Sequence, residues 1–141
     1  DKLSAINLKT YISELGRTIF QNYSISNKVQ LIVEAENIMI SVKLASPFGL
    51  IINELISNSM KYAFPDDRTG EITVCMKKID NELELAVTDD GVGIPKDLDW
   101  KNSNTLGLKL VRTLVENQLD GSIAMENNNG TKFTIKFNTE T

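Results

Sequence analysis

Residues 52–64 read INELISNSMKYAF, a stretch whose apolar side chains recur at helical spacing. On a helix that turns by about 100° per residue, most of these apolar side chains fall on one side. Glu54, Asn58 and Lys61 cluster on the opposite side, at spacings of four and three residues. This polar line is either the solvated face of an amphipathic helix or the wall of a binding site that combines an acid, a neutral oxygen ligand and a phosphate-binding cation.

The sequence around this stretch predicts helices that alternate with pairs of strands. Ser46 and Pro47 form a helix start, in which an N-cap residue is followed by proline at the first helical position. Asp80 and Asn81 join two alternating stretches as a hairpin turn. The apolar spacing predicts helices over residues 7–23, 46–63 and 107–118, and strands over 29–36, 38–45, 71–79, 82–89, 121–126 and 131–137. We therefore expect an α/β fold, a two-layer sandwich whose mixed, mostly antiparallel sheet is covered by helices on one face.

The composition is that of a single globular domain spanning residues 1–141. Hydrophobic residues make up 41% of the chain and charged residues 24%. The formal charge of −4 argues against a nucleic-acid surface, because phosphate backbones select basic patches. No run of about 18 apolar residues and no signal-peptide pattern is present, and the single Cys75 fits a reducing compartment. We expect a cytoplasmic domain without membrane contact.

Two absences bear on function. The chain begins at Asp1 without an initiator methionine, and we expect it to be a fragment of a longer protein. It also contains no histidine, so any chemistry that needs an imidazole must receive that group from elsewhere.

Two further stretches place polar residues or glycines at the ends of predicted elements. In VTDDGVGIP, Asp89 closes an apolar strand, where its carboxylate can accept a hydrogen bond from an exocyclic amine at a pocket floor. Gly91 and Gly93 let the backbone approach a flat ring. In NTLGLKLVRTLV, Gly107 opens a helix whose free N–H groups and dipole suit a phosphate. By itself, the first of these stretches is also typical of an ordinary turn with acidic residues.

In their order and spacing, four stretches resemble the N, G1, G2 and final Gly-Thr boxes of the GHKL ATPase superfamily. These stretches are NELISNSMKYAF, DDGVGIP, TLGLKLV and GTKF. The superfamily groups DNA gyrase, the ninety-kilodalton heat-shock chaperones, the mismatch-repair ATPases and histidine kinases. The chain is most similar to the catalytic and ATP-binding domain of sensor histidine kinases, in the subfamily whose N box reads N-E-L-x-x-N. This resemblance implies the Bergerat fold.

The resemblance implies ATP and Mg²⁺ as cofactors and assigns residues to the phosphates. Asn58 matches the residue that ligates the Mg²⁺ bridging the ATP phosphates. Glu54 matches the general base of the hydrolysing relatives, which makes it the candidate catalytic residue and a second candidate metal ligand. Lys61 and Tyr62 match residues beside the phosphates and the sugar.

The resemblance also assigns residues to the base and to the loop called the ATP lid. Asp89 matches the residue that binds the adenine amino group, and Thr131 matches the threonine that supports it, often through water. The other matching positions lie in loops around the nucleotide: Gly91, Gly93, Ile94, Gly107 and Leu108. The sequence departs from the family pattern in two ways, because Thr105 stands where a lid glycine is usual and the lid, roughly residues 94–106, is short.

The resemblance implies a kinase domain that transfers the γ-phosphate of ATP to a histidine on a separate dimerisation domain of the same polypeptide. The further partners it implies are a response regulator and, in the full-length protein, a second copy in a homodimer. Residues 1–25 would form the end of the dimerisation helices or a helix packed against that domain. Two alternatives stay open: a serine kinase of the anti-sigma-factor type with the same fold, and a nucleotide-binding module without turnover.

Overall fold

The computed structural model of the chain describes residues 5–23, 28–94, 99, 107–127 and 129–139. Its elements are β1 (Ala5–Asn7), α1 (Leu8–Gln21), β2 (Val29–Ala35), β3 (Met39–Ser41), α2 (Val42–Asn58), η2 (Ser59–Ala63), β4 (Gly70–Ile79), β5 (Glu82–Asp89), α3 (Leu108–Thr113), η4 (Leu114–Gln118), β6 (Ser122–Asn127) and β7 (Thr131–Asn138). The segments η2 and η4 are π-helical turns that continue α2 and α3.

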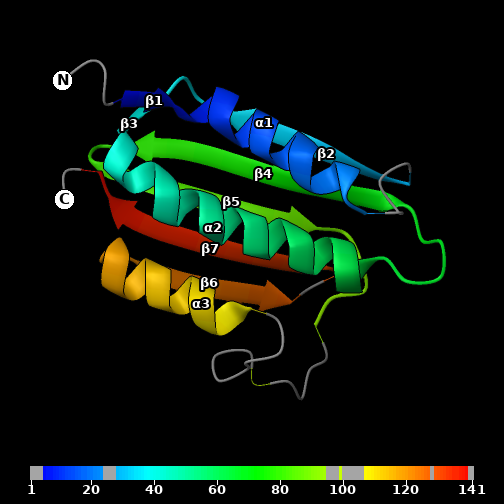
Figure 1. Cartoon of the computed structure of the whole chain (residues 1–141). Coiled ribbons are helices and arrows are strands. Elements are labelled where there is room, and N and C mark those ends of the chain that lie inside the picture. The colour runs from blue at the N-terminus through cyan, green and yellow to red at the C-terminus, as the bar shows by residue number, and fades with distance from the viewer. Residues whose placement is uncertain (1–4, 24–27, 95–98, 100–106, 128, 140–141) are drawn as a thin grey trace.

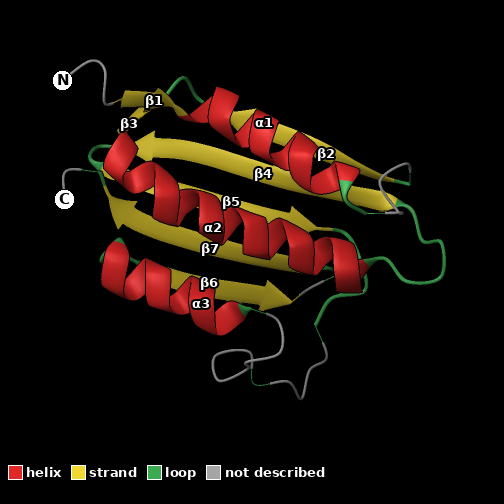
Figure 2. Cartoon of the chain, in the orientation of Figure 1, coloured by secondary structure: helices red, strands yellow, loops and turns green. Residues whose placement is uncertain are grey.

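These elements form two layers, a five-stranded sheet and a layer of helices on one of its faces (Figure 1, Figure 2). The strand order is β2-β4-β5-β7-β6, in which β2 runs parallel to β4 and the other neighbours are antiparallel. The helices α1, α2 and α3 lie side by side across this face. β1 and β3 form a separate two-stranded antiparallel sheet. The predicted two-layer α/β fold with a mixed, mostly antiparallel sheet is confirmed.

The central helix α2 begins earlier than the sequence predicts. The side chain of Ser41 accepts a hydrogen bond from Lys43 N at 3.2 Å and caps a helix whose first residue is Val42. Pro47 lies inside this helix, where its missing N–H leaves the carbonyl of Lys43 without its usual helical donor. The early turns bury apolar side chains, and this burial outweighs the loss of one hydrogen bond. The predicted helix start at Pro47 is therefore wrong, and the strand predicted over 38–45 is confirmed only at Met39–Ser41, because α2 begins at Val42.

The two strands before α2 do not pair with each other. β2 pairs with β4, whereas β3 pairs with β1, a strand that the sequence did not predict. A carboxylate oxygen of Glu36, just after β2, accepts a hydrogen bond from Lys78 N on β4 at 2.8 Å. The chain between β2 and β4 includes α2, and this helix supplies the crossover that a parallel pair of strands requires. The predicted pair of strands before α2 therefore does not form as a pair.

The core lies between the two layers and fixes the position of the functional site. Phe48 on α2 and Phe137 on β7 are both buried, and their ring centroids are 6.0 Å apart. In the sheet, Asp89 at the end of β5 lies opposite Thr131 at the start of β7. The packing of α2 on β5 and β7 thus brings the C-terminal end of the helix close to this pair.

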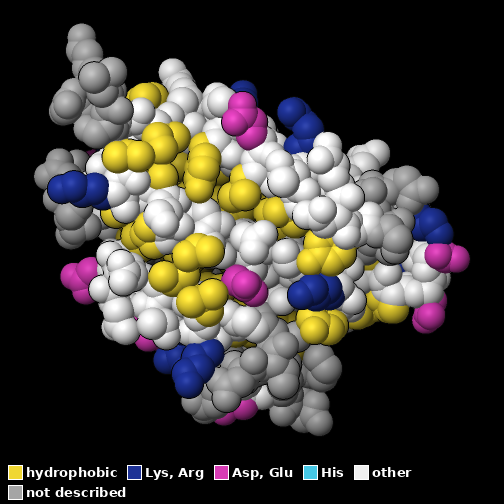
Figure 3. Space-filling model, in the orientation of Figure 1, with side chains coloured by type: hydrophobic (Ala, Val, Ile, Leu, Met, Phe, Trp, Pro, Cys, Tyr) yellow, Lys and Arg dark blue, Asp and Glu magenta, His cyan; other side chains and the backbone are white. Residues whose placement is uncertain are grey.

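The outer face of the helical layer is not uniformly polar. Figure 3 shows apolar side chains among the charged ones on this side of the molecule. Leu50 on α2 and Leu110 on α3 are among the exposed apolar side chains.

None of the described helices combines the length and the hydrophobicity that crossing a membrane requires.

Truncation of the aromatic pair tests the packing of the two layers. Phe48 is 0% exposed, so Phe48→Ala leaves a cavity beside Phe137 and should lower the free energy of unfolding by about 3–5 kcal/mol. Leu50 lies on the same helix but is 46% exposed, so Leu50→Ala should cost about 1 kcal/mol or less. Urea unfolding of both variants measures the two values. Equal losses would contradict the packing described here.

Candidate functional site

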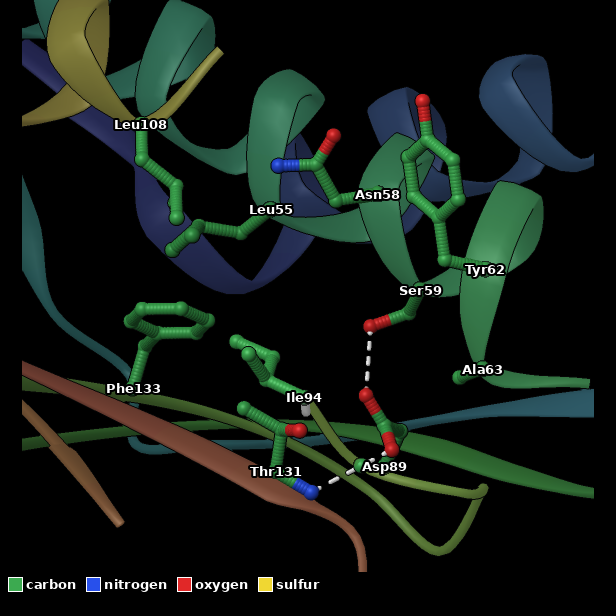
Figure 4. Close-up of a pocket in the computed structure, with 11 residues that line it drawn as sticks. Leu55, Asn58, Ser59, Tyr62, Ala63, Asp89, Ile94, Leu108, Thr131 and Phe133 are labelled. Atoms are coloured by element: carbon green, nitrogen blue, oxygen red, sulfur yellow. Dashed lines mark hydrogen bonds between the residues drawn. The ribbon is translucent and has the colours of Figure 1, made fainter. Parts of the chain in front are cut away.

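A pocket lies between the C-terminal part of α2, the ends of β5 and β7, and the start of α3 (Figure 4). About 370 Å³ of empty space, part of it open to solvent, lies between these segments. The described residues that line it come from these separate segments: Leu55, Asn58, Ser59, Tyr62, Ala63, Asp89, Gly93, Ile94, Leu108, Thr131 and Phe133.

The carboxylate of Asp89 is the buried charge of this pocket. Asp89 is 6% exposed, and its Oδ1 accepts hydrogen bonds from Gly91 N at 3.1 Å and from Thr131 N at 3.3 Å. Its Oδ2 accepts a hydrogen bond from the hydroxyl of Ser59 at 2.8 Å. Figure 4 shows Ser59 reaching down from the helix to this oxygen, while Thr131 approaches from the strand. Three segments that are distant in sequence therefore hold one carboxylate in a fixed orientation.

The environment of Asp89 makes its charged form costly. Burial raises the pKa of the Asp89 carboxyl above its ordinary value, and the hydrogen bonds from Ser59, Gly91 and Thr131 lower it and so oppose this effect. The neighbouring Asp90 raises the pKa further. A ligand that donates a hydrogen bond to the carboxylate would relieve part of the cost of burying the charge.

The walls of the pocket are apolar. The side chains of Leu55, Leu108 and Phe133 face the pocket above the strands, and Tyr62 stands at its rim with its hydroxyl directed away (Figure 4). Such walls suit a flat, uncharged ring, because they lose contact with water when the ring enters.

The chain after β5 is held close to the helix and to β6. A Cβ atom added at Gly91 would lie 2.2 Å from Ala63 O, so only glycine fits there. Gly91 supports the pocket from behind and does not line it, whereas Gly93 does. The side-chain amide of Asn127 accepts a hydrogen bond from Ile94 N at 3.1 Å and donates one to Ile94 O. This pair of bonds fixes Ile94 against the pocket.

Of the three polar residues that the sequence placed on one line, one lines the pocket. Asn58 lines the pocket, whereas Glu54 and Lys61 do not. A Cβ atom added at Gly107 would lie 2.1 Å from Oε2 of Glu54, which places this carboxylate beside the start of α3. Lys61 is exposed in the π-helical turn η2. The roles predicted for Glu54 and Lys61 stay predictions.

Most of the predicted lid lies outside the described residues, which omit 95–98 and 100–106. At its end, Gly107 has a φ of +69° and directly precedes α3. Leu108, the first residue of that helix, is buried and lines the pocket, and its predicted nucleotide-binding role stays a prediction.

The sequence analysis missed Ser59 and the apolar wall residues Leu55, Ala63 and Phe133. Ser59 stands within the N-box stretch, directly after Asn58. A hydroxyl on the apolar side of the predicted helix was the signal that could have identified it, because a buried hydroxyl needs a partner.

Comparison with known proteins identifies the family. Residues 44–141 match the family described as histidine kinase-, DNA gyrase B- and HSP90-like ATPases, and the chain belongs to this family. Blue-light-activated histidine kinase 2 of Erythrobacter litoralis is 35% identical over 89 residues, which are 62% of this chain and 26% of that protein. Sensor histidine kinase PdtaS of Mycobacterium tuberculosis is 38% identical over 82 residues, or 57% of this chain and 16% of that protein. The chain thus spans about a quarter or less of each of these relatives.

Solved structures agree with the sequence matches. The histidine kinase domain of the Erythrobacter litoralis EL346 blue-light-activated histidine kinase has a TM-score of 0.85 and 28% identity, and the match covers 96% of this chain and 62% of that one.

The serine-protein kinase RsbW of Listeria innocua is 30% identical over 81 residues, 48% of this chain and 52% of that protein. The similarity to histidine kinases covers more of the chain, and the predicted resemblance to their catalytic domains is confirmed.

Neutralising Asp89 tests the cost of its burial. Because burial raises its pKa, the penalty is absent at low pH, appears as pH rises through the folded-state pKa, and is present near neutral pH. In Asp89→Asn, the amide oxygen can still accept from Gly91 and Thr131, and the amide nitrogen can donate to Ser59. The empty variant should therefore melt a few degrees higher than the parent near neutral pH, and the difference should shrink as pH falls.

Thermal melts between about pH 4 and pH 8 measure this dependence. Asp80→Asn is the matched control, because Asp80 is exposed in the turn between β4 and β5. A lower melting temperature of Asp89→Asn at neutral pH, or a difference that does not change with pH, would contradict the cost assigned to the buried charge.

Proposed function

We propose that the chain is the ATP-binding catalytic domain of a sensor histidine kinase, with ATP as the phosphoryl donor. The observation that carries this proposal is the buried Asp89 carboxylate, which presents Oδ2 to an apolar pocket that also contains Asn58. Membership of the ATPase family and the similarity to histidine kinases support the same function.

The pocket suits adenine at its closed end. An ionised carboxylate only accepts hydrogen bonds, so Asp89 requires a donor from the ring, and the exocyclic amino group of adenine is such a donor. A ring with a carbonyl oxygen at that position would instead face the lone pairs of the carboxylate. The apolar side chains of Leu55, Ile94 and Phe133 supply contacts for the faces of the ring.

Asn58 is the residue that we assign to the phosphate end. Mg²⁺ prefers oxygen ligands and keeps several waters, so one amide oxygen together with phosphate oxygens is adequate ligation. No group of three or more His, Cys, Asp and Glu within the described part of the chain is arranged to hold a metal ion. The single amide oxygen of Asn58 fits a metal ion that arrives with the nucleotide. The charge of that ion would neutralise the phosphates.

The reaction requires an acceptor from outside the chain. The bond between the γ-phosphorus and the bridging oxygen breaks, and a bond to an imidazole nitrogen of the partner domain forms, which leaves ADP. The imidazole proton must pass to a base, and Glu54 is our candidate because it lies beside Gly107, at the predicted end of the lid. Catalysis here is mainly alignment and charge neutralisation. We propose that this domain lies in the cytoplasm and belongs to a homodimeric kinase. That kinase would pass the phosphoryl group to a response regulator.

Replacement of Asn58 tests the phosphate end. Asn58→Ala removes the proposed oxygen ligand and should weaken Mg²⁺-dependent ATP binding by about tenfold or more, since even outer-shell changes at metal sites cost about 10- to 100-fold. Asn53→Ala is the matched control, because Asn53 lies on the same helix and does not line the pocket. Calorimetry with Mg²⁺ and with a chelator separates the metal-dependent part. Equal Mg²⁺-dependent affinity in Asn58→Ala and the parent would refute the assignment.

Phosphoryl transfer tests the reaction. With labelled ATP the chain alone should form no phosphohistidine, because it contains no histidine. Mixed with the helical domain that precedes it in the full-length polypeptide, it should label that partner slowly, since separation lowers the effective concentration. Glu54→Gln should reduce this labelling more than it reduces ATP binding, whereas Glu116→Gln, at an exposed site on η4, should change neither.

The chemistry of the label distinguishes the candidate kinases. Acid-labile and base-stable label on the partner supports the histidine kinase. Label found only on serine would overturn the proposal and favour the serine-kinase alternative.

A further inference from the structure

The hydroxyl of Ser59 is a polar group in the pocket to which the family resemblance assigns no role. Ser59 is 8% exposed and directly follows Asn58 in the chain. Figure 4 shows the two side chains pointing to different parts of the pocket, with Ser59 directed toward the strands. Its hydroxyl donates to Oδ2 of Asp89 at 2.8 Å, a bond that joins two residues 30 positions apart.

The hydrogen bonds on Asp89 can be compared with the capacity of its carboxylate. An ionised carboxylate has about four lone-pair sites, two on each oxygen. The N–H groups of Gly91 and Thr131 both donate to Oδ1, and Ser59 occupies one site of Oδ2. One site of Oδ2 remains, and Ser59 determines which one, because it fixes the rotation of the carboxylate from the helix side.

We propose that Ser59 is a positioning and specificity-determining residue, which restricts the pocket to rings that present a hydrogen-bond donor to Asp89. This inference rests on the proposed binding of an adenine nucleotide. Ser59 does not itself select the ring. It keeps the carboxylate ionised and oriented, so that Asp89 can only accept a hydrogen bond.

Loss of the Ser59 hydroxyl would relax this restriction in two ways. The carboxylate would gain a second open site on Oδ2 and would be held only by the two N–H donors on Oδ1. Its ionised form would also lose a donor that opposes the effect of burial, and the charged neighbour Asp90 would still disfavour ionisation. A protonated Asp89 can donate a hydrogen bond, and it would then accept a ring that carries a carbonyl oxygen in place of the amino group.

Ser57 provides a matched control. It lies two residues earlier on α2 and is also 8% exposed, but it does not line the pocket. Ser57→Ala and Ser59→Ala therefore remove the same group from similarly buried positions on one helix. A general effect of losing a buried hydroxyl would appear in both variants, whereas an effect on base selection would appear only in Ser59→Ala.

The experiment compares the binding of ADP with that of inosine diphosphate, whose ring carries an oxygen where adenine carries the amino group. Calorimetry of the parent, Ser59→Ala and Ser57→Ala between about pH 5 and pH 8 gives affinity, base preference and pH profile. Ser59→Ala should bind ADP about 2- to 12-fold more weakly, the loss expected for one hydrogen bond, and should discriminate less against inosine diphosphate. The pH below which its base preference disappears should move upward.

A double-mutant cycle tests whether Ser59 acts through the carboxylate. In the Asp89→Asn background, Ser59→Ala should no longer alter base preference, because the ionised group that it positions is absent. An unchanged ADP affinity, base preference and pH profile in Ser59→Ala would overturn the inference while ADP binding by the parent stands. A parent that binds neither nucleotide would instead refute the proposed function, and the role inferred for Ser59 would then fall with it.

Discussion

The structure around the functional site depends on one buried carboxylate and the three donors that hold it. Asp89 receives hydrogen bonds from Ser59 of the helical layer, from Gly91 of the following loop and from Thr131 of the neighbouring strand. A charge removed from water is tolerated only where such partners replace the lost hydration. The strand register that sets Asp89 opposite Thr131 and the packing of the helix on the sheet must therefore both be correct before the site exists.

This arrangement links stability to function. The apolar surroundings raise the pKa of Asp89, so the empty domain carries part of the cost of a charge that a ligand's amino group can relieve. The same apolar surroundings strengthen the hydrogen bond when it forms, because little water competes for it. In the function that we propose, the pocket selects its ligand by the direction of one hydrogen bond and aligns the nucleotide for a transfer whose acceptor lies on another domain.

Much of the fold, and the position of Asp89 at the end of an apolar strand, could be predicted from sequence. The spacing of apolar residues predicted α1, β4 and β5 with nearly the observed boundaries. The apolar strand that ends at Asp89 indicated the floor of the pocket. The start of α2 could not be predicted, because Pro47 is a strong local signal for a helix start and the burial that overrides it is tertiary. The parallel pairing of β2 with β4 is also non-local, since it depends on the crossover through α2.

The supporting contacts of the site could not be predicted for a related reason. A helical wheel treats the helix as regular to its end, but the chain forms a π-helical turn at Ser59–Ala63. The wheel likewise placed Ser59 on the apolar side, where only the position of β5 reveals its partner Asp89. Residue types and spacing identified Asn58 and Asp89, whereas the supporting contacts required the packed layers.

A crystal structure of the domain with ADP would test the central claim most directly. We expect the exocyclic amino nitrogen of adenine to lie about 3 Å from Oδ2 of Asp89, with the Ser59 hydroxyl still donating to the same oxygen. Adenine bound elsewhere, for example in the open cleft lined by Arg68, Asn127 and Asn129 on the other side of the loop after β5, would contradict it.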